Sequence, residues 1–164
     1  MSFDSRTFRK ALGGFPTGVT VVTTKGAGDQ PPIGVTVSSF ASVSLDPPLV
    51  LFCLDRKNVD LPTFLANGSF AVNILREDQR ELSIRFAARA VESKFSDIEY
   101  TLWDSGAPIL AGCLANLECR IERTHEEGDH ILFIGHVTRL EYSQAGQPLA
   151  YWRGAYAQLG CPMP

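Results

Sequence analysis

Hydroxyl side chains are concentrated in one stretch, GVTVSSFASVSLDPP, which runs from Gly34 to Pro48. They lie at Thr36, Ser38, Ser39, Ser42 and Ser44. One interpretation is a solvent-facing strand edge that leads into a turn, because serine, threonine and proline favour turns. The other is a shelf on which a flat ligand approaches the backbone and bonds to hydroxyl and main-chain N–H groups. Small residues at consecutive positions favour the shelf, because an exposed edge needs them on one face only.

Two basic segments are candidates for binding an anion. The segment DRKN (Asp55–Asn58) places Arg56 and Lys57 between a predicted strand and the start of a predicted helix, where free N–H groups also attract anions. Further along the chain, Arg85 and Lys94 could reach a phosphate. The alternative for both segments is ordinary solvated charge, because loops are polar and exposed.

His130 follows a Gly-Asp turn, where its imidazole could donate a hydrogen bond or meet a phosphate at the mouth of a barrel. A solvated loop histidine is the alternative. The neighbouring His125 and His136 do not have the spacing of a metal motif. The sequence has no G-x-S-x-G, H-E-x-x-H, G-x-G-x-x-G or P-loop motif. These polar residues therefore supply binding groups rather than acid–base machinery, which is typical when a cofactor performs the chemistry.

Composition and charge narrow the classes of protein. The 164 residues are 45% hydrophobic and 20% charged, which predicts a single globular domain over residues 1–164. A net charge of −3 favours neither nucleic acid nor an anionic membrane as a partner. The longest apolar run, Pro47–Leu54, is too short to span a membrane, and the N-terminal residues do not resemble a secretory signal. We therefore expect the protein in the cytoplasm.

The cysteines are expected to be structural. None forms a C-x-x-C pair or has a histidine at the spacing of a zinc site, so no metal is expected. They lie at Cys53, Cys113, Cys119 and Cys161.

Hydrophobic patterning and turn residues divide the chain into strands and short helices. Helices are expected at Ser2–Leu12, Asn58–Ala66 and Glu77–Ala90. Strands are expected at Val19–Thr24, Ile33–Phe40, Pro48–Leu54, Phe70–Leu75, Leu114–Arg123 and His130–Tyr142. The apolar run Pro48–Leu54 predicts a strand buried on both faces, and Val91–Ala111 is expected to be an irregular surface loop. Because hairpin-length links join these strands, an antiparallel barrel with peripheral helices is predicted. The tail aromatics of YWRGAY are expected to dock on the domain or on a second subunit.

Taken together, these segments resemble the short-chain flavin reductases, the reductase components of two-component flavin monooxygenases. The resemblance extends from about Phe8 to Tyr156 and rests on the combination of FPTGV, SSFASVSLDPP and GDH. The segments FAVNILREDQRELSIRFA, LANLECRI and PLAYWRGAY follow in the order and spacing of that family. It implies a mainly β, split-barrel fold that binds FMN or FAD and forms a homodimer, with the flavin sites near the subunit interface.

The resemblance also assigns roles to individual residues. It implies that the strand Thr36–Ser39, including Val37, runs along the isoalloxazine ring, with Ser42 and Ser44 in the following turn. The segment Cys53–Asn58, including Leu54 and Lys57, would lie by the ribityl chain and phosphate. A second flavin-contacting segment would comprise Ser83, Arg85, Phe86 and Ala87. His130 would lie on the nicotinamide side, with Tyr151 near it. One departure is Ser38, where the family often has asparagine.

The function that this resemblance implies is an NAD(P)H:flavin oxidoreductase. Hydride would pass from nicotinamide C4 to flavin N5, and reduced flavin would serve a partner monooxygenase. NADH is favoured over NADPH because no basic cluster for a 2′-phosphate is evident. One alternative is a flavin-binding carrier on the same barrel that does not turn over NADH, and another is an oxidase or other enzyme on that scaffold. The residues leave open whether the flavin is FMN or FAD.

Overall fold

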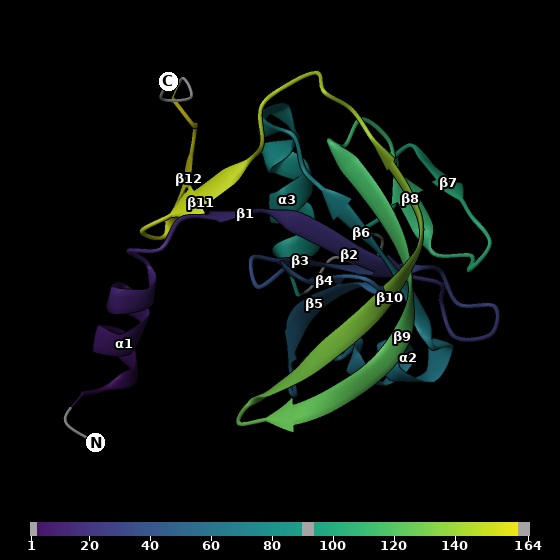
Figure 1. Ribbon diagram of the computed structural model, residues 1–164, viewed down its shortest axis with the longest axis horizontal. Helices are drawn as coiled ribbons and strands as arrows, with labels where there is room; N and C mark the ends of the chain where they lie inside the picture. The colour runs from purple at the N-terminus through teal and green to yellow at the C-terminus, as the bar shows by residue number, and fades with distance from the viewer. Residues whose placement is uncertain (1–2, 90–93, 161–164) are drawn as a thin grey trace.

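A seven-stranded antiparallel sheet forms the body of the protein. The computed structural model describes residues 3–89 and 94–160. The strands follow the order β3-β2-β6-β9-β10-β5-β4, and the sheet curls into a barrel (Figure 1). The edge strands β3 and β4 do not pair with each other, so the barrel is split. The strands are β2 (Thr20–Thr24), β3 (Ile33–Val37), β4 (Ala41–Leu45), β5 (Pro48–Asp55), β6 (Ser69–Ile74), β9 (Ala115–Glu127) and β10 (His130–Tyr142).

Stacked phenylalanines fill the barrel. Phe52 of β5 and Phe133 of β10 pair across neighbouring strands with ring centroids 4.7 Å apart, and both are fully buried. Phe64 and Phe70 pack edge-on against this pair, an arrangement that favours aromatic contacts. The prediction that β5 is buried on both faces is wrong. After the exposed Pro48, its residues alternate between buried and half-buried, because one face of the strand meets the core and the other does not.

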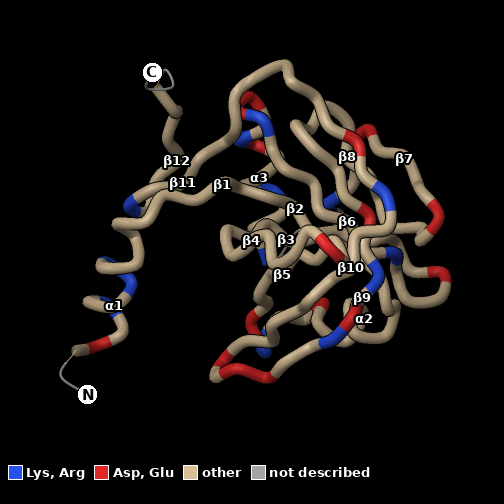
Figure 2. Tube along the Cα trace, in the orientation of Figure 1, with Lys and Arg blue, Asp and Glu red and all other residues tan. Residues whose placement is uncertain are grey.

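The hairpin β9–β10 confirms the predicted turn at Gly128-Asp129. Gly128 adopts a left-handed conformation, with φ of 58°, as this turn requires. The two strands are the longest of the sheet, and β9 continues past its predicted end at Arg123. Acidic residues gather at the tip of this hairpin, whereas basic residues gather on the N-terminal helix (Figure 2).

Short helices cover parts of the barrel. Helix α2 (Leu61–Asn67) ends at the left-handed Gly68, a conformation that glycine favours after a helix. The predicted helix Glu77–Ala90 is shorter and divided into a 3₁₀ turn, η1 (Glu77–Gln79), and α3 (Arg80–Ala87). The Gln79 side chain accepts the Arg76 N–H at 2.9 Å and thereby caps this turn. Ala90, the predicted helix end, lies outside the described residues. None of the described helices is long and apolar enough to cross a membrane.

The expectation of an irregular loop over Val91–Ala111 is wrong for its second half. Strands β7 (Tyr100–Leu102) and β8 (Pro108–Leu110) form a hairpin there. Residues 91–93 lie outside the described part of the chain. The Asn73 side chain accepts the Leu110 N–H at 2.9 Å and holds the hairpin to the sheet. This tie joins distant segments, so local patterning does not reveal it.

A small arm projects from the barrel (Figure 1). Asp4 is the N-cap of helix α1 (Ser5–Leu12), and its carboxylate accepts the Thr7 N–H at 2.7 Å. A three-stranded sheet follows it in space, in the order β1-β11-β12. Its strands are β1 (Thr17–Gly18), β11 (Ala150–Trp152) and β12 (Ala155–Ala157). No residue of α1 is buried.

Candidate functional site

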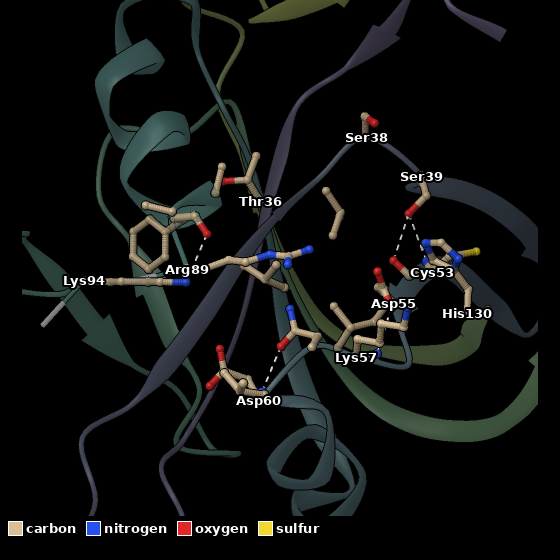
Figure 3. Close-up of a pocket in the computed structure, with 18 residues that line it drawn as sticks. Thr36, Ser38, Ser39, Cys53, Asp55, Lys57, Asp60, Arg89, Lys94 and His130 are labelled. Carbon is tan, nitrogen blue, oxygen red and sulfur yellow. Dashed lines mark hydrogen bonds between the residues drawn. The ribbon is translucent and has the colours of Figure 1, made fainter. Parts of the chain in front are cut away.

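One cavity gathers most of the residues predicted to contact a ligand. Its volume is about 600 Å³, and it opens beside β3, the end of β5 and the C-terminal end of α3 (Figure 3). This volume is typical of sites for small molecules and cofactors. We call this cavity the β3–β5 pocket. The predicted residues that line it are Thr36, Val37, Ser38, Ser39, Cys53, Leu54, Lys57, Asn58, Phe86, Ala87 and His130.

Strand β3 forms one wall and has a free backbone edge. Within the seven-stranded sheet it pairs with β2 alone, and an edge strand carries unpaired N–H and C=O groups. The carbonyl of Gly34 on this strand accepts a hydrogen bond from Lys94 Nζ at 3.1 Å. Ring heteroatoms of a flat ligand can bond to such groups.

Two hydroxyls of this wall hold the pocket together. Thr36 Oγ1 donates to the carbonyl of Ser83 at 2.7 Å and so ties β3 to α3. Ser39 Oγ accepts the Cys53 N–H at 2.9 Å and donates to the Cys53 carbonyl at 3.2 Å. This pair of bonds joins the chain after β3 to β5 across the split of the barrel. Ser38, between them, is exposed.

The segment after β5 forms a compact turn. The Lys57 N–H donates to Asp55 Oδ1 at 2.8 Å, and Asn58 Oδ1 accepts the Asp60 N–H at 2.8 Å. Lys57 lines the pocket, whereas Arg56 forms an ion pair with Glu126 at 3.0 Å, and its side chain does not line the pocket. One of the two cations predicted for this segment therefore faces the cavity.

His130 is held at the pocket by its neighbour. Its Nδ1 donates to Asp129 Oδ1 at 2.7 Å, because an ionised carboxylate can only accept. This hydrogen bond holds the pKa of the Asp129 carboxyl below its usual value. The bond engages one ring nitrogen and leaves Nε2 for a ligand.

The wall on the α3 side carries positive charge. Arg89 and Lys94 lie on this side, and Lys57 and His130 lie opposite (Figure 3). Burial lowers the pKa of the Lys94 ammonium. With Asp55 and Asp60 also in the lining, the cations outnumber the carboxylates, which favours an anionic ligand.

Five predicted residues lie outside this lining. Ser42 and Ser44 lie on strand β4 and not in the turn that the resemblance implies. Ser83 is buried behind Thr36, where its hydroxyl lies 2.9 Å from that of Tyr156. Arg85 donates to the Ser96 carbonyl at 2.7 Å. Tyr151 lines a separate cavity of about 670 Å³ beside β11 and β12.

Several lining residues were not in the predicted set. Lys94 is predicted only as a cation that could reach a phosphate, on the signal of its basic side chain, and not as one of the flavin-contacting residues. Arg89 enters because α3 ends earlier than expected, and Asp55 and Asp60 enter through the turn after β5. The further lining residues are Val35, Val59 and Ala88.

The described cysteines do not form a reactive pair. Cys53, Cys113 and Cys119 are all free thiols, and Cys161 lies outside the described residues. Burial raises the pKa of Cys113 to about 11 and that of Cys119 to about 12. Cys53 is half-buried in the pocket, where burial also raises its pKa. Within the described ranges, no three His, Cys, Asp or Glu side chains gather as metal ligands would.

Comparison with known proteins places this site in context. Residues 12–160 match the family model described as "Flavin reductase like domain". The chain is 43% identical over 155 residues to FMN reductase (NADH) SmoA of Agrobacterium fabrum, covering 94% of this chain and 86% of that protein. It is 41% identical over 155 residues to the reductase subunit HsaB of a flavin-dependent monooxygenase of Rhodococcus jostii, covering 94% and 78%.

A solved structure gives the same result. The NADH:FAD oxidoreductase SgcE6 of Streptomyces globisporus, in complex with NAD and FAD fragments, superposes with a TM-score of 0.89 at 38% identity. The match covers 96% of this chain and 93% of that one. The split barrel, the predicted segments and these matches agree over nearly the whole chain. This protein therefore belongs to the flavin reductase family.

Proposed function

We propose that this protein is an NADH-dependent flavin reductase that binds FMN or FAD in the β3–β5 pocket. The observation that carries the proposal is the β3–β5 pocket, because its lining suits a flavin and the chain belongs to the flavin reductase family. A free strand edge, small side chains and a surplus of cations surround a cavity of about 600 Å³. A flavin has a flat ring rich in hydrogen-bonding atoms and an anionic phosphate, and both match this lining.

The ring would lie along Thr36–Ser39. No large side chain projects from these positions, and the free edge of β3 offers main-chain donors and acceptors to the ring. Thr36 and Ser39 use their hydroxyl hydrogens within the protein, so their main role here is to hold the segments around the pocket together. The phosphate would lie near Lys57 and Asn58.

The nicotinamide would be placed by His130, which stands opposite the α3 wall (Figure 3). Asp129 fixes the ring orientation of this histidine, and Nε2 is left to donate to or accept from the amide of the nicotinamide. When bound, the flavin supplies the hydride-accepting chemistry, taking a hydride at N5 from nicotinamide C4. The protein contributes alignment, and positioning alone is worth about 7–11 kcal/mol in favourable systems. NADPH is a possible second donor.

The partners follow from this activity. The relative HsaB is a reductase subunit of a flavin-dependent monooxygenase, and we infer that this chain likewise supplies reduced flavin to a separate monooxygenase. We also infer a cytoplasmic homodimer. The apolar side chains of α1 support the dimer, because Phe8 is 50% exposed and Leu12 is 57% exposed in the single chain and a second subunit would cover them.

The test is steady-state NADH oxidation with free FMN or FAD in excess. We expect turnover with at least one flavin, and the ratio of the rates with FMN and FAD defines the preferred substrate. Repeating the assay with NADPH tests the choice of nicotinamide. A protein that binds flavin but supports no continuous NADH oxidation would be a carrier and not a reductase.

A further inference from the structure

Lys94 joins the two walls of the β3–β5 pocket. Its Nζ donates to the carbonyl of Gly34 at 3.1 Å and to the carbonyl of Phe86 at 3.2 Å. Gly34 lies on β3, directly before the residues that line the pocket, and Phe86 lies in the last turn of α3. Figure 3 shows the Lys94 side chain reaching in from the α3 side, toward the cavity that it lines. The ammonium therefore bridges a strand and a helix that are far apart in the sequence.

The surroundings of this bridge are closely packed. A methyl group at Gly34 would lie 2.6 Å from the Phe86 ring, so the ring rests directly on the backbone of β3. Phe95, the residue after Lys94, packs edge-on against Phe86 with centroids 5.0 Å apart. Lys94 and Phe95 together return the chain to the end of α3, next to the lining residues Ala87 and Arg89.

Placing the ammonium here costs desolvation energy. Burial lowers the pKa of Lys94, which is the sign of an ammonium removed from water. The partners are two neutral carbonyls, one of them at a helix C-terminus, where a cation is favoured. A half-buried ammonium of this kind is a poor means of stabilising a fold compared with an apolar side chain. Its position indicates a role in the site.

We propose that Lys94 is a positioning residue that sets the width of the flavin pocket by tying the end of α3 to β3. This inference rests on the proposed function. A pocket formed before binding spares the ligand the cost of ordering its walls, so the tie raises flavin affinity. The bond from Thr36 to Ser83 holds α3 to β3 independently, so loss of the Lys94 bridge leaves the helix attached.

The test compares FMN binding, monitored by flavin fluorescence, and NADH oxidation in the wild type and in Lys94→Met. Lys94→Met keeps an unbranched side chain, one heavy atom shorter, and removes the charge and the donors. We expect the Kd for FMN to rise about tenfold, as for loss of hydrogen bonds from a charged group. In NADH oxidation we expect the KM for FMN to rise in parallel with the Kd, because the variant weakens flavin binding. Lys94→Arg, which retains charge and donors, is expected to recover much of the affinity.

The control is Lys25→Met, which removes an exposed lysine in the loop between β2 and β3, away from the pocket lining. If Lys94 has a purely structural role, Lys94→Met lowers the thermal midpoint of unfolding and the folded fraction, while the folded variant keeps the wild-type Kd for FMN. That result overturns the inference. If Lys94→Met does not fold, Lys94→Gln is judged by the same comparison. If the wild type binds FMN and Lys94→Met binds it with the same Kd, the role of Lys94 is contradicted and the proposed function is not. A wild type that binds no flavin contradicts the proposed function as well.

Discussion

At the scale of single residues, hydrogen bonding separates groups that face a ligand from groups that hold the pocket together. Thr36 and Ser39 both lie at the pocket, yet each donates its hydroxyl hydrogen to a protein carbonyl. Lys57 and His130 keep groups that point to the cavity. The residue types in the sequence predict which stretch carries the site, because small and hydroxyl residues cluster there. They do not predict which hydroxyl is engaged, since the partners Ser83 and Cys53 come from other elements.

Replacing His130 with alanine tests the nicotinamide role. The imidazole would be lost from the side of the pocket that faces the α3 wall, while the β3 edge stays intact. We expect the KM for NADH to rise about tenfold, because the variant loses a contact that binds NADH equally in the ground state and the transition state. The Kd for flavin should change by less than about twofold. His125→Ala, on the exposed part of β9, is the matched control. An unchanged KM for NADH would argue against this assignment.

Alkylation of Cys53 reports on occupation of the pocket. The thiolate is the reactive form, and burial raises the pKa of this thiol, so labelling at pH 8 is expected to be slow and to accelerate beyond pH 9.0. Bound FMN should slow it further, because Cys53 lines the cavity. Mass spectrometry of iodoacetamide-treated protein measures both effects. Cys113 and Cys119 should react only after unfolding. Labelling of Cys53 at equal rates with and without bound flavin would place the ligand elsewhere.

At the scale of elements, most strands of the seven-stranded sheet could be predicted, whereas β4 and the three-residue strands β7 and β8 could not. The regions of β2, β5, β6 and β10 carry β-branched and apolar runs that outweigh other local preferences. Strands β7 and β8 have three residues each, and they depend on contacts such as the one from Asn73. The early end of α3 likewise cannot be predicted from the local sequence. The extended Ala88 turns the chain into the pocket wall, and the local sequence, rich in helix formers, does not indicate this.

Replacing Gly34 with alanine tests the contact of α3 with β3. The added methyl would meet Phe86, which is fully buried and cannot move aside without disturbing the core. We expect the free energy of unfolding to fall by about 1–3 kcal/mol, as for other overpacked sites, and flavin binding to weaken with it. Urea unfolding measures the first effect. Gly18→Ala is the control, because nothing lies within 4 Å of its added methyl. Equal stability of the two variants would contradict the close packing.

At the scale of the whole molecule, the arm exposes apolar side chains that nothing within the described part of a single chain covers. Helix α1 carries its apolar residues on one face, and Phe15 just after it is 75% exposed. Trp152 of β11 donates its indole N–H to the Gly14 carbonyl at 3.2 Å, a contact within the arm, whereas the Tyr156 hydroxyl lies 2.9 Å from that of Ser83 in α3. The sequence indicates the amphipathic helix by its spacing. It does not reveal that the helix projects from the barrel, because that depends on where β1 and β11 pair.

We expect the arm to mediate a homodimer, with a mass in solution of twice the 17.9 kDa of one chain. Phe8→Asp puts a charge on the apolar face of α1 and should shift the protein toward monomer, measured by light scattering after size exclusion. Lys10→Ser, on the opposite face of the same helix, is the control and should remain dimeric. A monomeric wild type would contradict this assembly, whereas a dimeric Phe8→Asp variant would place the interface elsewhere.

The central claim is that the β3–β5 pocket supports repeated transfer of reducing equivalents from NADH to flavin. The most direct measurement is the number of NADH molecules oxidised per chain when free FMN or FAD is in large excess. We expect continuous oxidation far beyond one equivalent of NADH per chain, limited by the NADH supplied. A single reduction event per chain, or none, would contradict it and would leave a flavin-binding protein without reductase activity.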